Sequence, residues 1–292
     1  MSITLAKSAG FCFGVSRAVE LVEAAAAEGK RVMTLGPIIH NRHVVERFNS
    51  MGVTVIEAPE EAGPDDTVII RSHGVSEAVY LRLQATGCQI VDATCPFVKR
   101  IHNLVNQASQ EQAIPVIIGT PTHPEVEGIA GWCTGGRIFE TPEALDNWCK
   151  SGEVDSDSSI CMVSQTTSTE SLWKMCGEIA KKQFTNLKIF DTICRATELR
   201  QSEAGQLSKN CQAMVVVGDV TSSNTGRLAM ICREHCDRVF LVDNASELNP
   251  ADFRGVTNVG ITAGASTPAW IIKEVNKTMS EIINVEAVQE EN

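Results

Sequence analysis

The chain has 292 residues, of which 43% are hydrophobic and 21% charged, so its composition is that of a globular protein rather than a disordered one. Its net charge of −11, with no basic stripe, excludes a general nucleic-acid binder, because phosphate repulsion would stay uncompensated. No apolar run has the length of a membrane span, and the N-terminus lacks the apolar core of a signal peptide. We therefore expect a cytoplasmic protein with no membrane partner, whose eleven cysteines stay reduced.

Apolar runs rich in β-branched residues predict buried strands at intervals along the chain. They lie at residues 31–35, 67–70, 89–93, 115–119, 160–164, 187–191, 213–218, 238–242 and 256–262. Between them, segments such as residues 16–29 and 96–110 carry apolar residues at helical spacing. Strands that alternate with helices predict an α/β protein with parallel sheets and crossover helices.

Three cysteines mark an internal repeat. Cys12, Cys95 and Cys194 each stand between a strand-like and a helix-like run, and each is followed 28 residues later (40 − 12, 123 − 95, 222 − 194) by a polar loop. These loops contain His40, His123 and Ser222, and a second polar loop follows in each third, at His73, Thr166 and Ser266. A unit repeated three times can bring three thiols to one axis. We place domains at residues 14–95, 96–193 and 194–268, the last completed by residues 1–13 and 269–292.

Six polar loops run from a predicted strand into a predicted helix. Their sequences are TLGPIIHN, IIRSHGV, IIGTPTHPEVEG, MVSQTTS, VVGDVTSSNTG and GITAGASTP. In an open parallel sheet such loops gather at the carboxyl ends of the strands, where helix N-termini attract anions. The side chains in them that can donate hydrogen bonds to a diphosphate are His40, His73, His123, Ser222, Ser223, Asn224 and Ser266. This set of donors predicts a site for a small buried anion.

Each repeated cysteine opens a predicted helix, whose dipole favours the thiolate form that binds metals. A single cysteine of this kind is usually a small buried residue, but three in register predict a metal centre. Because the chain has no C-x-x-C pair, one iron–sulfur cluster held by one cysteine per domain is favoured over a zinc ribbon or a ferredoxin-like site. With only three repeated ligands, a fourth iron would stay open to substrate.

Two further side chains are candidates for proton transfer. Glu125 begins a repeated loop and can serve as a proton donor or relay, although a glutamate in the first turn of a helix is also common dipole chemistry. Thr166 can pass a proton or bind a hydroxyl, or it can cap a helix within the run SQTTS. The segment CREHC, from Cys232 to Cys236, fits a packed face better than a metal pair.

These motifs resemble the 4-hydroxy-3-methylbut-2-enyl diphosphate reductase family, which performs the last step of the non-mevalonate isoprenoid pathway. The resemblance runs from GFCFGV through GPIIHN, SHGV, DATCP, HPEVEG, SQTT, DTIC and SSN to GITAGAS, and so spans nearly the whole chain. It implies three pseudo-symmetric α/β domains in a trefoil-like arrangement around a central 4Fe–4S cluster. Cys12, Cys95 and Cys194 match the cluster ligands, and the fourth iron is open. Loss of that iron in oxygen would leave a 3Fe–4S cluster.

The resemblance also implies the reaction and the roles of the site residues. (E)-4-hydroxy-3-methylbut-2-enyl diphosphate would lose its hydroxyl to give isopentenyl and dimethylallyl diphosphate. Two electrons from reduced ferredoxin or flavodoxin would pass through the cluster. Glu125, Thr166 and His123 match the catalytic residues. The diphosphate would bind to His40, His73, His123, Ser222, Ser223, Asn224 and Ser266.

The sequence departs from many relatives at Phe13 and at Arg71–Ser72, which leaves pocket details near the cluster open. Two other classes of protein also remain open. An aconitase-like dehydratase would use an open iron for hydroxyl loss, but it would need no external electrons. A redox sensor or cluster carrier would use three thiols, but it would not need Glu125.

Overall fold

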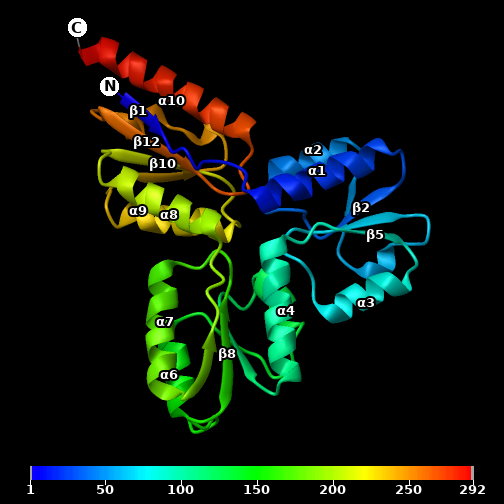
Figure 1. Cartoon of the computed structure of the whole chain (residues 1–292). Helices are drawn as coiled ribbons and strands as arrows, with labels where there is room; N and C mark the ends of the chain where they lie inside the picture. Colours follow the sequence, from blue (N-terminus) through cyan, green and yellow to red (C-terminus); the bar gives the residue numbers. More distant parts are fainter. Residues whose placement is uncertain (1, 291–292) are drawn as a thin grey trace. The chain divides into compact units, whose positions relative to one another are not determined.

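The computed structural model of the protein describes residues 2–290, and the side chains of residues 2–283. It contains three parallel sheets of four strands each, whose strands are joined by crossover helices (Figure 1). This confirms the predicted α/β class and its threefold repeat. The chain forms two compact units, of which the first comprises residues 1–15, 40–44 and 195–292 and the second residues 16–39 and 45–194. The predicted domain boundaries stay a prediction, and residues 1, 291 and 292 in them lie outside the described chain.

The first unit is built on one sheet with the strand order β1-β12-β10-β11. Its elements are β1 (Ser2–Leu5), α8 (Arg195–Ser208), β10 (Ala213–Val217), α9 (Ser223–Arg233), β11 (Val239–Val242), 3-10 turns at Ala245–Glu247 and Pro250–Phe253, β12 (Asn258–Ala263) and α10 (Ala269–Glu290). Successive side chains of a strand point to opposite faces, and both faces of β10 are buried. Val215 packs in a core with α10, and Val216 packs in a second core with α8 and α9. Figure 1 shows α10 on one side of this sheet and α8 and α9 on the other.

The second unit contains two sheets, the first with the order β3-β2-β4-β5. Its elements are α1 (Phe13–Ala27), β2 (Val32–Leu35), α2 (Arg42–Ser50), β3 (Thr54–Ile56), a 3-10 turn at Pro59–Glu61, β4 (Thr67–Ile70), α3 (Glu77–Ala85) and β5 (Gln89–Asp92). The first residues of α1 and α2 group with the first unit. Met33 of β2 and Val68 of β4 form a core with Leu83 of α3.

The other sheet of the second unit has the order β7-β6-β8-β9. Its elements are α4 (Pro96–Gln110), β6 (Ile114–Ile118), α5 (Pro124–Ala130), β7 (Arg137–Phe139), α6 (Pro142–Lys150), β8 (Ser159–Ser164), α7 (Glu170–Gln183) and β9 (Asn186–Ile189). Met162 of β8 faces a core with α6 and α7, whereas Val163 faces a core with α4 and α5. Helices therefore cover both faces, as a parallel sheet requires.

The register of the strands sets the level at which the loops begin. In the two central strands of each sheet, Leu35 lies opposite Ile70, Ile118 opposite Ser164, and Val217 opposite Ala263. These residues are the last of their strands. The two loops that follow the central strands therefore leave each sheet side by side.

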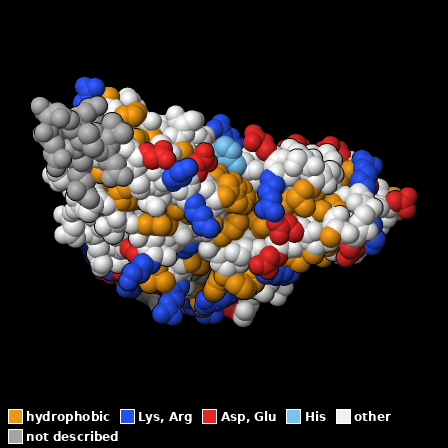
Figure 2. Space-filling view, turned by 90° about the horizontal axis from the view of Figure 1, so that it is seen from above, with side chains coloured by type: hydrophobic (Ala, Val, Ile, Leu, Met, Phe, Trp, Pro, Cys, Tyr) orange, Lys and Arg blue, Asp and Glu red, His pale blue; other side chains and the backbone are white. Residues whose placement is uncertain are grey.

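The surface shows charges of both signs. On the face drawn in Figure 2, Lys and Arg side chains are interspersed with Asp, Glu and hydrophobic side chains. Within the described part of the chain, no helix combines the length and the apolar character that a bilayer crossing needs.

Candidate active site

Each sheet presents the same three features at the carboxyl ends of its strands. An edge strand leads to a cysteine, and the two central strands lead to the predicted polar loops. In the first sheet, Cys12 follows the edge strand β1, and Ser266 and Ser222 follow β12 and β10. In the second, Cys95 follows the edge strand β5, and His73 and His40 follow β4 and β2. In the third, Cys194 follows the edge strand β9, and Thr166 and His123 follow β8 and β6. The sequence repeat is therefore a repeat of sheet topology, and each sheet contributes one thiol.

The backbone holds the three cysteines in the same way. The amide of Cys12 donates to the carbonyl of Ala265 at 3.2 Å, that of Cys95 to Ser72 at 2.9 Å, and that of Cys194 to Thr166 at 3.0 Å. Each acceptor lies in the polar loop of the neighbouring strand. Each cysteine also directly precedes a helix, namely α1, α4 or α8, where the dipole favours a thiolate.

The three repeated cysteines differ from most of the others in their exposure. All three are partly exposed, whereas Cys149, Cys161, Cys176, Cys232 and Cys236 are buried. Burial raises the pKa to about 11 for the Cys161 and Cys176 thiols and to about 12 for that of Cys232, which opposes metal binding as thiolates. In the segment CREHC, Cys232 and Cys236 are both buried in the core with α8 and α9, as the sequence predicted for a packed face. The helix α9 ends at Arg233, so Cys236 lies just beyond it, whereas the sequence predicted a continuous helical stretch.

Glu125 and Thr166 form a buried pair in the second unit. Glu125, the second residue of α5, is 2% exposed, and Thr166, in the loop after β8, is 7% exposed. The Thr166 amide donates to Glu125 Oε1 at 2.6 Å, and its hydroxyl donates to Oε2 at 2.8 Å. Because the carbonyl of the same threonine accepts from Cys194, Thr166 joins the carboxylate to the cysteine loop.

His123 caps the helix that carries Glu125. Its Nδ1 accepts a hydrogen bond from the Glu125 amide at 3.1 Å, which satisfies one N–H of the first turn. In the neutral ring, an accepting Nδ1 places the proton on Nε2. The rings of His73 and His123 lie edge to face with centroids 5.6 Å apart. The second unit therefore brings His73, His123, Glu125 and Thr166 into one neighbourhood.

The His73 loop is held on several sides. The backbone amide of Ser72 donates to the Ile38 carbonyl at 3.1 Å, and the indole of Trp132 donates to the Val75 carbonyl at 2.8 Å. Gly74 has a φ of +74°, and a Cβ there would lie 2.7 Å from Cε1 of His102, which stacks on Trp132. The glycine is therefore needed both for its backbone conformation and for the close approach of α4.

The two departures at Arg71 and Ser72 are integrated into this loop. The Arg71 side chain donates to the Gly74 carbonyl at 3.4 Å and lines a cavity of about 180 Å³ with Gly36 and Glu127. Ser72 is 7% exposed, and its carbonyl is the acceptor for Cys95. The third departure, Phe13, is 64% exposed.

The first unit brings together the predicted serine and asparagine ligands. Ser222 caps α9 by accepting from the Thr225 amide at 3.4 Å, and the Ser266 hydroxyl donates to that of Ser222 at 3.4 Å. Asn224 is 4% exposed, and among the described residues neither of its amide atoms has a hydrogen-bond partner. Buried amides are normally satisfied, so Asn224 is a candidate ligand for a polar group. Ser223 accepts from Arg227 at 3.3 Å.

The predicted residues thus fall into two groups. Cys12, His40, Ser222, Ser223, Asn224 and Ser266 belong to the first unit, and Cys95, His73, His123, Glu125, Thr166 and Cys194 to the second. The sequence did not predict two supporting contacts. Gln165 is fully buried, and its side-chain oxygen accepts from the Thr120 amide at 3.2 Å, which links the loops after β6 and β8. His102 was expected only as a helical residue. No periodicity marks either contact.

Comparisons with known proteins agree with this geometry. The model of the LytB protein family matches residues 3–280. The 4-hydroxy-3-methylbut-2-enyl diphosphate reductase of Aquifex aeolicus (strain VF5) is 42% identical over 288 residues, which cover 97% of this chain and 97% of its own. The reductase of the same name from Thermoanaerobacter sp. (strain X514) is 40% identical over 281 residues, which cover 95% of this chain and 96% of its own.

Two solved structures are also similar. A structure of (E)-4-hydroxy-3-methyl-but-2-enyl diphosphate reductase, the terminal enzyme of the non-mevalonate pathway, is 41% identical with a TM-score of 0.69, and covers 96% of this chain and 100% of its own. The E-1-hydroxy-2-methyl-but-2-enyl-4-diphosphate reductase of Plasmodium falciparum is 25% identical with a TM-score of 0.89, and covers 96% of this chain and 87% of its own. The resemblance seen in the motifs is confirmed, and the chain belongs to the LytB protein family.

Proposed function

We propose that this protein reduces (E)-4-hydroxy-3-methylbut-2-enyl diphosphate to isopentenyl and dimethylallyl diphosphate. The substrate would take up two electrons and two protons, its C–O bond to the hydroxyl would break, and water would leave. The observation that carries the proposal is the position of Thr166. Its amide and hydroxyl donate to the buried carboxylate of Glu125, and its carbonyl accepts from the amide of Cys194, a candidate cluster ligand. Proton supply and redox chemistry would thus meet at one residue. The names of the matched relatives support the same reaction.

A 4Fe–4S cluster held by Cys12, Cys95 and Cys194 is the cofactor that we propose. The fit rests on the three equivalent amide hydrogen bonds, the helix after each cysteine and the partial exposure of all three thiols. Bound there, the cluster would supply the electrons and one iron open to the substrate hydroxyl. The protein must then bind the substrate, orient it and deliver protons.

For the diphosphate, we propose hydroxyl, amide and imidazole ligands. They are His40, His73, His123, Ser222, Ser223, Asn224 and Ser266. Asn224 gives the clearest support, because a buried amide with no protein partner costs folding free energy that a phosphate oxygen would offset. The Nε2–H tautomer of His123 supplies a second donor.

Glu125 is the proposed proton source, with Thr166 between it and the substrate hydroxyl. Both carboxylate oxygens are held, so the group has one orientation in a site that excludes bulk water. A proton on Oε2 would be accepted by the Thr166 hydroxyl, which would turn and pass its own proton to the leaving oxygen. General acid catalysis of this kind typically contributes factors of about 10² to 10⁴ in rate.

Reduced ferredoxin or flavodoxin is the proposed electron donor. Support comes from the segment that begins beside Cys95. Residues 93–110 contain no aspartate or glutamate, although the chain has 36 acidic residues in total. Phe97 is 46% exposed two residues after the cysteine, and Lys99 and Arg100 are exposed beyond the buried Val98. An acidic electron carrier could therefore approach this cysteine without strong repulsion.

The first test is an anaerobic assay of the reconstituted protein with the proposed substrate and a reduced viologen dye. We expect substrate-dependent oxidation of the dye and formation of both isoprenoid diphosphates. Hydroxyl loss without dye oxidation would favour the dehydratase. An intact cluster with no turnover at all would favour the redox sensor, and either result would overturn the proposal.

A further inference from the structure

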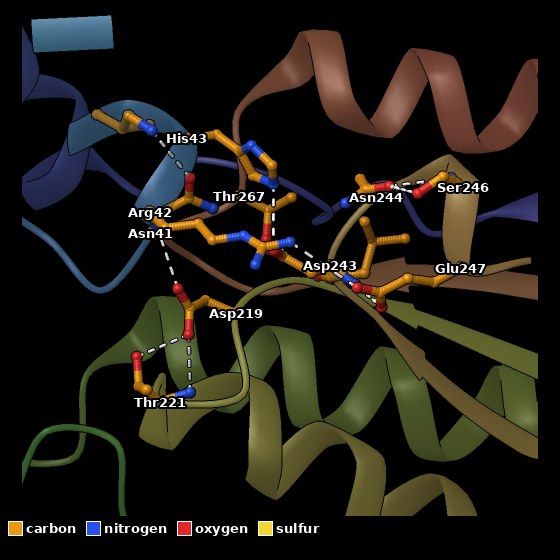
Figure 3. A network of polar contacts seen from close by, with 12 residues as sticks. Asn41, Arg42, His43, Asp219, Thr221, Asp243, Asn244, Ser246, Glu247 and Thr267 are labelled. Atoms are coloured by element: carbon orange, nitrogen blue, oxygen red, sulfur yellow. Dashed lines mark hydrogen bonds and ion pairs between the residues drawn. The ribbon is translucent and has the colours of Figure 1, made fainter. Parts of the chain in front are cut away.

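We propose that Asp219 and Asp243 are positioning residues that hold His40 in place for the diphosphate. They do so by fixing residues 40–44 through contacts with Arg42 and His43. We call the set of Arg42, His43, Asp219 and Asp243 the His40 clasp (Figure 3). All of the clasp lies in the first unit, with Ser222, Asn224 and Ser266. The inference rests on the proposed function, because it assigns a purpose to the placement of His40.

Asp243 forms the first attachment. It directly follows β11 and is 7% exposed. Its Oδ2 contacts Nε of Arg42 at 2.5 Å and Nε2 of His43 at 3.1 Å. The Asp243 amide donates to Glu247 at 2.9 Å, and Arg42 also lies 3.9 Å from Glu247. A nearly buried carboxylate that serves two neighbouring side chains of one segment restricts that segment strongly.

Asp219 forms the second attachment, in the loop between β10 and α9. Its Oδ2 accepts from the backbone amide of Arg42 at 3.2 Å, and its Oδ1 accepts from the amide and the hydroxyl of Thr221 at 2.8 and 2.7 Å. Arg42 is the first residue of α2, so the carboxylate also faces the positive end of that helix. The same loop continues to Ser222, three residues after Asp219.

The segment between the two attachments is short and internally fixed. Asn41 is 2% exposed, and its side-chain oxygen accepts from the Val44 amide at 3.1 Å, which caps the start of α2. His40 directly precedes this cap. With Arg42 held through both its backbone and its side chain, the backbone at His40 has little freedom, and the imidazole stays with the loop that carries Ser222.

Both attachments use a carboxylate, but the two carboxylates bind different parts of the segment. Asp219 holds the backbone of the segment and Asp243 its side chains. Hydrogen bonds from Thr221 and Arg42 keep the pKa of Asp219 below its usual value although burial acts to raise it, so this acceptor stays ionised at neutral pH. Neither aspartate is itself proposed to touch the substrate.

The test combines hydrogen exchange with a double-mutant cycle on the reconstituted protein. The variants are D219N, D243N, H40A and H40A/D243N, and the control is D237N, which removes an exposed aspartate of the same unit. We expect faster amide exchange in residues 40–46 of D219N and D243N, but not of D237N. The KM for the substrate and the Kd for inorganic diphosphate should rise about tenfold in D243N, with kcat changed much less.

The cycle separates positioning from a general loss of structure. If Asp243 acts through His40, adding D243N to H40A should change the Kd for inorganic diphosphate less than about twofold. Independent losses in the double variant, or unchanged exchange in residues 40–46, would overturn the proposal. Should D243N fail to fold, R42Q removes the same contact from its exposed side and allows the same cycle. If the wild type shows no turnover, the proposed function fails, and exchange and diphosphate affinity still decide on the clasp.

Discussion

Glu125 is 2% exposed, and one residue engages both of its carboxylate oxygens. We predict that E125Q keeps the fold and the cluster, because glutamine has the same shape, but lowers kcat by a factor of about 10² or more, since an amide cannot supply the proton. Anaerobic dye oxidation measures this, and the iron content and visible spectrum report on the cluster. The control is E127Q, an exposed glutamate of the same helix. Near-normal turnover in E125Q would remove the proton role.

A substitution at Gly74 tests whether the stability of the His73 loop depends on the close approach of α4. We predict that G74A destabilises the protein by about 2–4 kcal/mol, because a left-handed φ and a Cβ 2.7 Å from His102 both oppose it. G135A is the matched control, since Gly135 has a φ of +71° with nothing within 4 Å of an added Cβ. That variant should lose only about 1–2 kcal/mol from backbone strain. Thermal unfolding midpoints of the two variants compare them, and equal midpoints would contradict the packing argument.

At the scale of elements, the nine predicted runs coincide with β2, β4 to β6 and β8 to β12. The strands outside these runs, β1, β3 and β7, have three or four residues each and lie at sheet edges, where too few positions carry a period. Helices α1 and α4 begin within a few residues of their predicted starts, because Cys12 and Cys95 follow strands and Pro96 favours a first helical position. The six polar loops that the sequence predicted are those that follow the two central strands of each sheet.

What the sequence could not predict is the contacts between segments distant in the chain. Asp243 lies 200 residues from His43, and Trp132 lies 57 residues from Val75. Such pairs leave no periodic signal, since each partner looks like an ordinary polar or aromatic residue in its own segment. The candidate ligands were therefore predicted, but the residues that hold them were not.

Helix α4 carries a histidine that should make stability depend on pH. Burial lowers the pKa of His102 from 6.5 to about 4; Asp92 acts to raise it and Lys99 to lower it. Between these values the unfolded chain binds a proton that the folded chain excludes, so stability rises with pH and is lost as pH falls below 6.5. The loss should approach about 3 kcal/mol near pH 4. We predict that H102Q shows a smaller fall in thermal midpoint from pH 7 to pH 5 than the wild type.

The reference for this comparison is H235Q, which changes an exposed histidine in the turn after α9. It should keep the pH dependence of the wild type. If H102Q and the wild type lose the same stability on acidification, the imidazole of His102 is not the group responsible. Because His102 packs against Gly74, the H102Q midpoint at pH 7 should also be lower, and only the slope with pH tests the titration.

At the scale of the whole molecule, the net charge of −11 would repel an acidic electron carrier from most of the surface. The start of α4 is an exception, since residues 93–110 lack carboxylates and expose Phe97, Lys99 and Arg100. Lys99 contacts Asp92 at 2.5 Å, which leaves Arg100 as the cation of this turn with no ion pair among the described residues. A partner that docks here would therefore depend on Arg100 most strongly at low salt.

We predict that R100E raises the KM for reduced ferredoxin about tenfold at low ionic strength, and less at high ionic strength, because salt screens the repulsion. Turnover with a small viologen dye should stay within about twofold of the wild type, since the dye needs no docking surface. R233E, at the exposed end of α9, makes the same change of charge elsewhere and controls for net charge. Equal effects of R100E and R233E would mean that the carrier senses only the total charge of the protein. A fall in dye turnover in R100E would instead place the defect at the site itself.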